Sequence, residues 1–143
     1  MRVRQGIRIG VALTLGSLIL TAPALAATKK APRLFIAPSG GVRSGQVVKV
    51  RGVGFTPHDA VYLTECLVKA TGAGGCNVAS ATPVTIDAKG AFGWTKFKVL
   101  SGTIGSGTCG TTKANLKNCA ISAGNAAGKD SATLRITFLA PKK

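Results

Sequence analysis

The chain has 143 residues, and its 19 lysines and arginines outnumber four acidic residues, for a formal net charge of +15. This length predicts one domain with a modest hydrophobic core and leaves no room for a second large domain. So positive a chain favours anionic partners such as nucleic acid, cell-wall polymer or acidic lipid. The charge alone also suits a basic protein without a specific partner.

Residues 1–26 have the features of a secretory signal peptide. Three arginines precede an apolar run over residues 11–25, and the run ends in an A-x-A cleavage pattern. Cleavage there predicts a secreted, extracellular protein with a flexible lead-in over residues 27–33 and one domain over residues 34–143. An uncleaved membrane anchor is the alternative. Polar residues and a proline interrupt the apolar run, and no later segment approaches the roughly 20 apolar residues of a membrane helix.

The chain has four cysteines, an even number that favours two disulfides in an exported protein. Three connectivities are open. The pairs Cys66–Cys76 and Cys109–Cys119 each close a short local loop, so we expect that pairing, with about 2–3 kcal/mol of stabilisation from each bond. There is no C-x2-C pair, and the single histidine, His58, falls in a predicted turn, so we expect no metal site.

Seven segments have the alternation and the bounding turn residues of β-strands, and no helical pattern of useful length follows the signal. They predict an all-β fold, a seven-stranded immunoglobulin-like antiparallel β-sandwich with two local disulfides. In chain order the predicted strands are residues 34–37, 46–52, 60–66, 82–86, 92–99, 118–123 and 131–139.

Two of these strands invite finer predictions. In residues 60–66 the alternation places Tyr62, Thr64 and Cys66 on the face opposite to the predicted core. In residues 92–99 the alternation slips, and a bulge near Thr95–Lys96 would reconcile its two halves. Core and surface positions are both open to Trp94, and we expect core packing because it is the more common for tryptophan. The Gly/Ser/Thr-rich stretch over residues 101–112 predicts a flexible loop.

The acidic residues give little support to catalysis. Hydrolytic triads need a base beside a nucleophile, and the only histidine lies in a turn. Asp87 and Asp130 also fall in turns, where aspartate usually makes local hydrogen bonds. We expect Glu65 to be an ordinary solvated strand residue. The sequence therefore predicts a protein that is not an enzyme and has no catalytic residues.

Basic side chains alternate outward on two predicted strands, and we expect those strands to pair. The resulting face would follow the phosphates of DNA or an anionic cell-wall polymer without reading sequence. We expect no aromatic side chains between the basic ones to stack on bases, and so no base-specific recognition. The alternative role is protection of the sheet against aggregation. The residues of this predicted face are Arg33, Lys49, Arg51, Lys96 and Lys98.

Four stretches of the chain resemble the neocarzinostatin family, the apoproteins of secreted antibiotics. The resemblance spans Leu34 to Phe138, and the first cysteine pair with its following asparagine is its most specific part. The stretches are PSGGVRSGQVVKVRGVGF from Pro38, the block Tyr62…Glu65-Cys66…Cys76-Asn77, VTIDAKG from Val84, and CAI…NAAG from Cys119.

The resemblance implies a cleft on the outer face of the larger sheet, bordered by the first disulfide loop. Members of the family hold a labile enediyne chromophore there without a covalent bond. The released chromophore cuts DNA, and the protein binds, shields and delivers it. By position, the ligand-binding residues here would be Tyr62, Thr64, Cys66, Val68, Cys76, Ala81, Ala120, Ser122 and Gly124.

This chain also departs from the family pattern. Val68 and Ala81 stand where the best-known member has bulky aromatic residues, which leaves Tyr62 as the best single candidate for a ligand contact. The alternative role of Tyr62 is ordinary packing on the sheet surface. We therefore expect a monomeric, non-catalytic carrier of a small apolar ligand, with an antibiotic, DNA-targeting role as in the family. The alternative is a secreted basic protein that binds anionic polymers through its Lys/Arg face, with a vestigial cleft.

Overall fold

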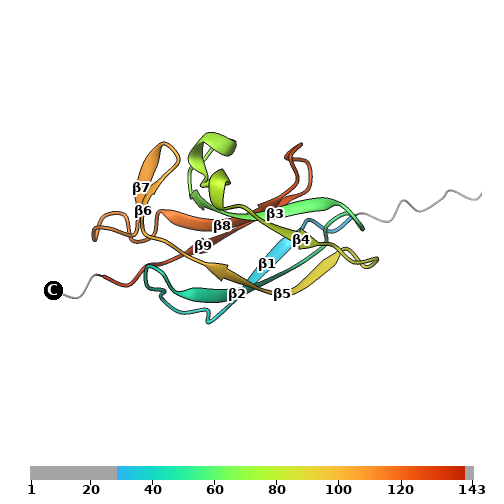
Figure 1. Cartoon of the computed structure of the whole chain (residues 1–143), viewed down its shortest axis with the longest axis horizontal. Coiled ribbons are helices and arrows are strands. Elements are labelled where there is room, and N and C mark those ends of the chain that lie inside the picture. Colours follow the sequence, from blue (N-terminus) through green and yellow to red (C-terminus); the bar gives the residue numbers. More distant parts are fainter. Residues whose placement is uncertain (1–28, 141–143) are drawn as a thin grey trace, which may run out of the picture.

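The computed structural model describes residues 29–140, which form two antiparallel sheets packed face to face (Figure 1). The three-stranded sheet has the order β1-β2-β5, from β1 (Arg33–Ala37), β2 (Val47–Val53) and β5 (Ala91–Lys98). The four-stranded sheet has the order β4-β3-β8-β9, from β4 (Thr82–Thr85), β3 (Ala60–Leu67), β8 (Cys119–Gly124) and β9 (Ser131–Ile136). The predicted seven-stranded sandwich is confirmed.

The predicted signal peptide, residues 1–26, and the first two residues of the lead-in lie outside the described residues. Within residues 29–140, no helix has the length and apolar character that a membrane crossing requires. The only helical elements there are two 3-10 turns, η1 (Ala73–Gly75) and η2 (Val78–Ser80).

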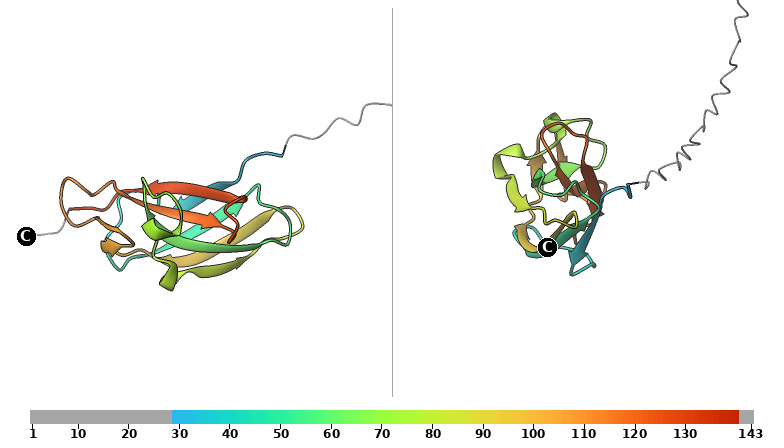
Figure 2. Two further views of the ribbon diagram at one scale, coloured as in Figure 1. Left: turned by 90° about the horizontal axis from the view of Figure 1, so that it is seen from above. Right: turned by 90° about the vertical axis from the view of Figure 1, so that its right-hand side faces the viewer.

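The two sheets lie one above the other as layers (Figure 2). Inward-facing side chains from both sheets form one hydrophobic core. Their period of two follows from strand geometry, because successive side chains point to opposite faces of a sheet. Pro83 lies on β4, an edge strand, where its missing N–H breaks no ladder. The buried core residues include Val48, Val50, Val61, Leu63, Phe92, Phe97, Ile121, Ala123 and Ile136.

The stretch predicted as a flexible loop instead contains a hairpin, so that prediction is wrong. Strands β6 (Gly102–Ile104) and β7 (Gly107–Cys109) pair antiparallel and project beside the sandwich (Figure 1). Two buried residues attach the hairpin to the core, Ile104 and the disulfide-bonded Cys109. The sequence did not indicate these strands because each has only three residues and begins with Gly-Thr, which leaves no hydrophobic alternation to recognise.

The strand β5 contains the predicted irregularity, two residues earlier than expected. Val50 pairs with Thr95 and Gly52 pairs with Phe92, so Gly93 and Trp94 together stand opposite Arg51. This extra residue turns Trp94 to the outer face, where its side chain is 51% exposed. The prediction that Trp94 packs in the core is therefore wrong.

Both predicted disulfides are present, Cys66–Cys76 and Cys109–Cys119. The two turn aspartates differ in their roles. Asp87 accepts hydrogen bonds locally, as predicted, whereas the buried Asp130 binds distant partners, the Thr56 N–H and the Lys29 ammonium at 3.2 Å. Burial raises the pKa of Asp130, but these hydrogen bonds and the Lys29 charge outweigh burial and lower it overall.

Candidate functional site

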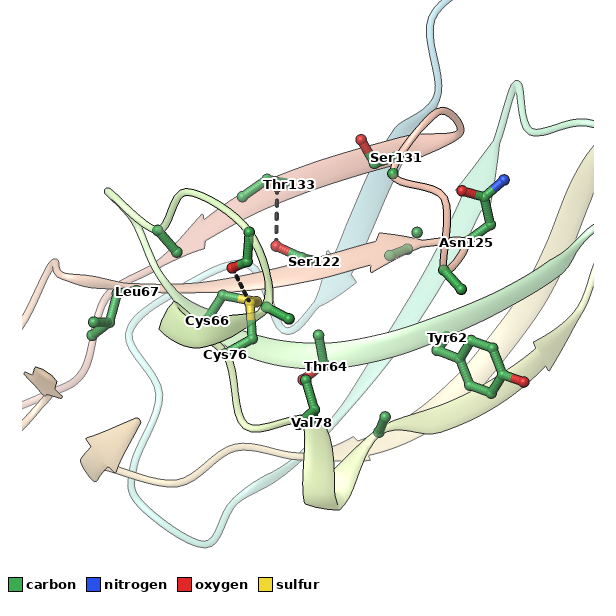
Figure 3. Close-up of a pocket in the computed structure, with 18 of the residues that line it drawn as sticks. Tyr62, Thr64, Cys66, Leu67, Cys76, Val78, Ser122, Asn125, Ser131 and Thr133 are labelled. Carbon is green, nitrogen blue, oxygen red and sulfur yellow. Dashed lines mark hydrogen bonds between the residues drawn. A yellow bond between two sulfur atoms is a disulfide. The ribbon is translucent and has the colours of Figure 1, made fainter. Parts of the chain in front are cut away.

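A cleft of about 630 Å³ lies on the outer face of the four-stranded sheet. This volume is within the roughly 300–1,000 Å³ of small-molecule sites. The disulfide loop, defined here as residues 67–75 between Cys66 and Cys76, rises over the sheet on one side of the cleft. The β8–β9 loop, residues 125–130, rises on the other side (Figures 1 and 3).

The floor of the cleft consists of outward-facing residues on three neighbouring strands. Thr64 on β3 pairs with Ser122 on β8, which pairs with Thr133 on β9, so the three form one row across the sheet. The Ser122 and Thr133 hydroxyls are 3.0 Å apart and hydrogen-bonded (Figure 3). The Thr64 hydroxyl donates to the Asn77 carbonyl at 2.9 Å. Each hydroxyl of the floor therefore takes part in an internal hydrogen bond.

Tyr62 is the only aromatic residue among those that line the cleft within residues 29–140, and it is 43% exposed. It lies two residues before Thr64 on β3, opposite Gly124 on β8, toward the end of the strands at which the β8–β9 loop begins (Figure 3). Its ring offers a flat apolar surface and a hydroxyl at one tip, a combination that suits ligand contact at an accessible site.

Besides the bond between Cys66 and Cys76, backbone hydrogen bonds attach the disulfide loop and its flanking residues to the rest of the fold. The Val68 N–H donates to the Asn118 carbonyl at 2.8 Å. The Asn77 N–H donates to the Glu65 carbonyl at 2.8 Å, and the Ser106 N–H in the β6–β7 hairpin donates to the Gly74 carbonyl at 2.9 Å. A Cβ added at Gly105, which has a φ of 51°, would lie 2.2 Å from that carbonyl oxygen. The hairpin that sequence reasoning missed therefore supports one wall of the cleft.

No charged side chain lines the cleft among the described residues, although the chain as a whole is strongly basic. The lining is mainly alanine, glycine, valine and cysteine, with a few hydroxyls and the Asn125 amide. The Asn125 amide donates to the Asp59 carboxylate at 2.8 Å, which fixes the start of the β8–β9 loop. An uncharged, largely apolar ligand fits such a lining best.

The structure brings together the residues predicted for ligand binding, with one exception. Tyr62, Thr64, Cys66, Val68, Cys76, Ala81, Ser122 and Gly124 all line the cleft. Ala120 is fully buried and does not line it, so its expected place on the floor is wrong. It stands directly opposite Cys66 in the sheet, where the disulfide lies next to its methyl group.

Sequence reasoning missed several lining residues. Thr133 could have been predicted as a lining residue, because the alternation of β9 points its side chain outward and because it pairs with Ser122. The position of the β8–β9 loop had no sequence signal, because its alanines and glycines are ordinary turn residues. The same holds for Val78, which is 59% exposed in η2. The missed residues are Leu67, Ala70, Gly72, Ala73, Val78, Ala123, Asn125, Ala126, Ala127, Gly128, Ser131 and Thr133.

Glu65 is buried beneath the floor, so the prediction of a solvated side chain is wrong. It has the same inward phase as Val61 and Leu63, and only 2% of the residue is exposed. One carboxylate oxygen, Oε2, accepts a hydrogen bond from the Leu100 N–H at 2.9 Å, and Oε1 is buried without a partner among the described residues. Burial raises the pKa of Glu65 to about 7, although the bond from Leu100 opposes this shift.

The Glu65 carboxylate also lies close to the second disulfide. Its oxygen and the sulfurs of Cys109 and Cys119 are within 4.8 Å of one another. The two sulfurs are bonded to each other, so they offer no thiolate for a metal ion. The surroundings of Glu65 are therefore those of a buried acid within a hydrophobic core.

An antiparallel sandwich with an uncharged cleft on its larger sheet defines the structural class of this protein, and comparisons with known proteins identify the family. The Neocarzinostatin family matches residues 34–138. Actinoxanthin and the antitumor antibiotic C-1027 apoprotein, both from Streptomyces globisporus, are each 32% identical over 138 residues, which cover 94% of either chain. Macromomycin from Streptomyces macromomyceticus is 30% identical over 140 residues, which cover 94% of this chain and 92% of its own. The chain belongs to the neocarzinostatin family.

Solved structures agree with this assignment. A macromomycin structure, 32% identical, superposes with a TM-score of 0.59 and covers 76% of this chain and all of its own. The solution structure of apokedarcidin is 24% identical, with a TM-score of 0.53 over 77% of this chain, and supports the fold alone.

Proposed function

We propose that this protein is an exported, non-catalytic carrier that holds one small, uncharged, largely apolar ligand in the cleft above β3, β8 and β9. The observation that carries the proposal is the uncharged lining of a cleft of about 630 Å³ in a strongly basic chain. Apoproteins of the neocarzinostatin family carry a chromophore, and by analogy the ligand would be chromophore-like, with an antibiotic role. The signal over residues 1–26 and one domain over residues 34–143 are parts of the same proposal.

The features of the cleft suit a ligand-binding site better than a catalytic site. The floor hydroxyls of Thr64, Ser122 and Thr133 are engaged in internal hydrogen bonds, and no acid or base lines the cleft among the described residues. Such a lining binds by apolar contact and shape, and it keeps water away from a reactive ligand without taking part in chemistry.

The first experiment is native mass spectrometry, with absorbance, on protein purified cold and in the dark from the cell that produces it. Extra mass together with absorbance outside the protein band would support a carried chromophore. A bare mass of the two-disulfide protein, repeated for recombinant protein mixed with extract of the producer, would count against the carrier proposal.

Tyr62→Ala is expected to weaken binding of a neutral aromatic dye, such as Nile red, about tenfold. Tyr62 is the one aromatic residue that lines the cleft among residues 29–140, and its loss removes stacking and apolar area worth about 1.4 kcal/mol. Dye fluorescence titrations at constant ionic strength measure the effect.

A matched control for Tyr62→Ala is Leu139→Ala, which removes an exposed large apolar side chain outside the cleft. Leu139→Ala should bind the dye as the unchanged protein does. Equal weakening by both substitutions, or no effect of Tyr62→Ala, would show that the dye does not bind in the cleft.

A further inference from the structure

The outer face of the three-stranded sheet, on the opposite side of the sandwich from the cleft, exposes two aromatic rings and an arginine in one row. Phe35 on β1 pairs with Arg51 on β2, and Trp94 from the β5 bulge lies on the other side of Arg51. The Arg51 guanidinium carbon is 4.3 Å from the Phe35 ring centroid and 5.2 Å from that of Trp94. We call these three residues the stacking row. The expectation that no aromatic residues stand between the basic ones is wrong.

Lysines continue the face beside the stacking row. Lys49 on β2 pairs directly with Lys96 on β5, and Lys98 pairs with Val47 at the next outward position. All three lysines are exposed, and Arg33 is exposed at the opposite end, on β1. No acidic residue occurs in β1, β2 or β5. The face is therefore a region of concentrated positive charge that contains aromatic rings.

Protection of the sheet edges explains only part of this arrangement. Lysines guard edge strands against pairing with other chains, which suits Lys96 and Lys98 on β5. Lys49 and Arg51 lie on β2, the central strand, which has no free edge to protect. Charge repulsion also opposes the pairing of Lys49 with Lys96, so the fold tolerates an unfavourable cross-strand pair there.

The stacking row leaves its charge and its rings available to a partner. Arg51 forms no ion pair within residues 29–140, and its buried Nε has no hydrogen-bond partner there. Trp94 is 51% exposed and Phe35 is 39% exposed, large fractions for aromatic side chains on a folded protein. Aromatic rings, arginine and lysines on one sheet face are the groups with which proteins bind single-stranded nucleic acid.

We propose that this face binds single-stranded nucleic acid, with bases stacked on Phe35, Arg51 and Trp94 and phosphates held by the neighbouring lysines. A duplex keeps its bases inside the helix, so it can use the lysines but not the rings. The face offers no set of oriented polar groups for reading base edges, so binding is expected to be independent of sequence. The proposal is separate from the carrier function, because the cleft lies on the other sheet.

The sole tryptophan of the chain makes a direct test practicable. An oligothymidylate of about ten nucleotides is titrated into the protein while Trp94 fluorescence is followed, and anisotropy of a labelled oligonucleotide gives the affinity in parallel. We expect quenching of the Trp94 fluorescence. The logarithm of the affinity should fall linearly with the logarithm of the salt concentration, with a slope of about −0.7 for each phosphate contact. We also expect weaker binding to a duplex and to an abasic strand of equal length.

Two variants separate stacking from charge. Phe35→Leu with Trp94→Leu should weaken oligothymidylate binding at least tenfold, while the salt slope stays unchanged. Lys49→Ala with Lys96→Ala should weaken binding of every strand and reduce the salt slope by roughly one to two. The matched control, Lys113→Ala with Lys117→Ala, removes the same charge from exposed positions elsewhere and should bind nearly as the unchanged chain does. Circular dichroism verifies that each variant is folded.

Three outcomes would overturn the proposal. The first is equal affinity for oligothymidylate, abasic strand and duplex without quenching of Trp94, which would mean phosphate attraction alone. The second is binding to a polyglycerol-phosphate polymer but not to oligothymidylate, which would assign the face to cell-wall polymer. The third is no binding at low salt. None of them bears on the cleft, which the dye titration tests by itself.

Discussion

Replacing Cys66 and Cys76 together with alanine is expected to lower the free energy of unfolding by about 2–3 kcal/mol and to weaken dye binding in the cleft at least tenfold. The bond closes a short loop, and its loss returns conformational freedom chiefly to the unfolded chain. The effect on binding has a different origin, because the disulfide loop is one wall of the cleft and contains three glycines that hold no conformation by themselves. Urea unfolding and the dye titration measure the two effects separately.

Removal of the second disulfide provides a comparison with the same loop length. Cys109→Ala with Cys119→Ala should cost at least as much stability, because both residues are fully buried and their loss also leaves a cavity. It should disturb the cleft less, since the bond between Cys66 and Cys76 still holds the wall. If the variant without Cys66 and Cys76 binds dye normally, the backbone hydrogen bonds at Val68, Gly74 and Glu65 must be sufficient to hold the loop.

The fold was predictable from the sequence because strand alternation and turn residues reinforce each other. In β3 and β9 most inward residues are apolar, such as Leu63 and Ile136, and a shift of register by one residue would expose them. The local disulfides followed from loop length. The errors occur where a local feature shifts the alternation of inward and outward residues, or where the residue types show no such alternation. The bulge at Gly93 turns Trp94 outward, and the β6–β7 hairpin is made of residues that carry no hydrophobic pattern.

The candidate site was only partly predictable. Tyr62, Thr64 and Ser122 follow from alternation once the larger sheet is placed, and the resemblance to the family supplied the sheet. The walls come from loops whose course depends on contacts far away in the sequence, such as the hydrogen bond from Ser106 to Gly74. Contacts between residues so far apart in the sequence cannot be inferred from local sequence patterns. The stacking row was missed for the same reason, since Phe35 and Trp94 meet Arg51 only after three strands have paired.

For Glu65 the strand alternation indicated the correct inward direction, but its acidic side chain led to the wrong prediction of a solvated position. The alternation of β3 places position 65 inward, but an acidic residue is almost never fully buried without a partner, so a solvated position was expected. The structure buries it with one hydrogen bond, from Leu100, and leaves Oε1 without a partner among the described residues. Such a group favours its protonated form, and the free energy of unfolding therefore depends on pH.

Glu65 is expected to make the protein less stable as the pH rises from about 4.5 to about 7. Its pKa is about 7 in the folded chain and has its ordinary value of 4.5 in the unfolded chain, so the folded state binds more protons across this interval. The free energy of unfolding therefore falls with pH, by roughly 3 kcal/mol from this group in total. Asp130 acts at lower pH with the opposite sign, because its pKa is lowered and its stabilisation is lost on acidification.

Glu65→Gln isolates this contribution, since an amide keeps the acceptor for the Leu100 N–H and cannot ionise. We expect the variant to lose most of the decline between pH 4.5 and 7 and to exceed the unchanged protein in stability above pH 7. Glu65→Ala is the matched comparison, because it leaves the Leu100 N–H unpaired beside a void and should be destabilising at every pH. Urea unfolding across the pH series gives the slopes. If the Gln variant keeps the slope of the unchanged protein, another group is responsible and Glu65 is buried without consequence for folding.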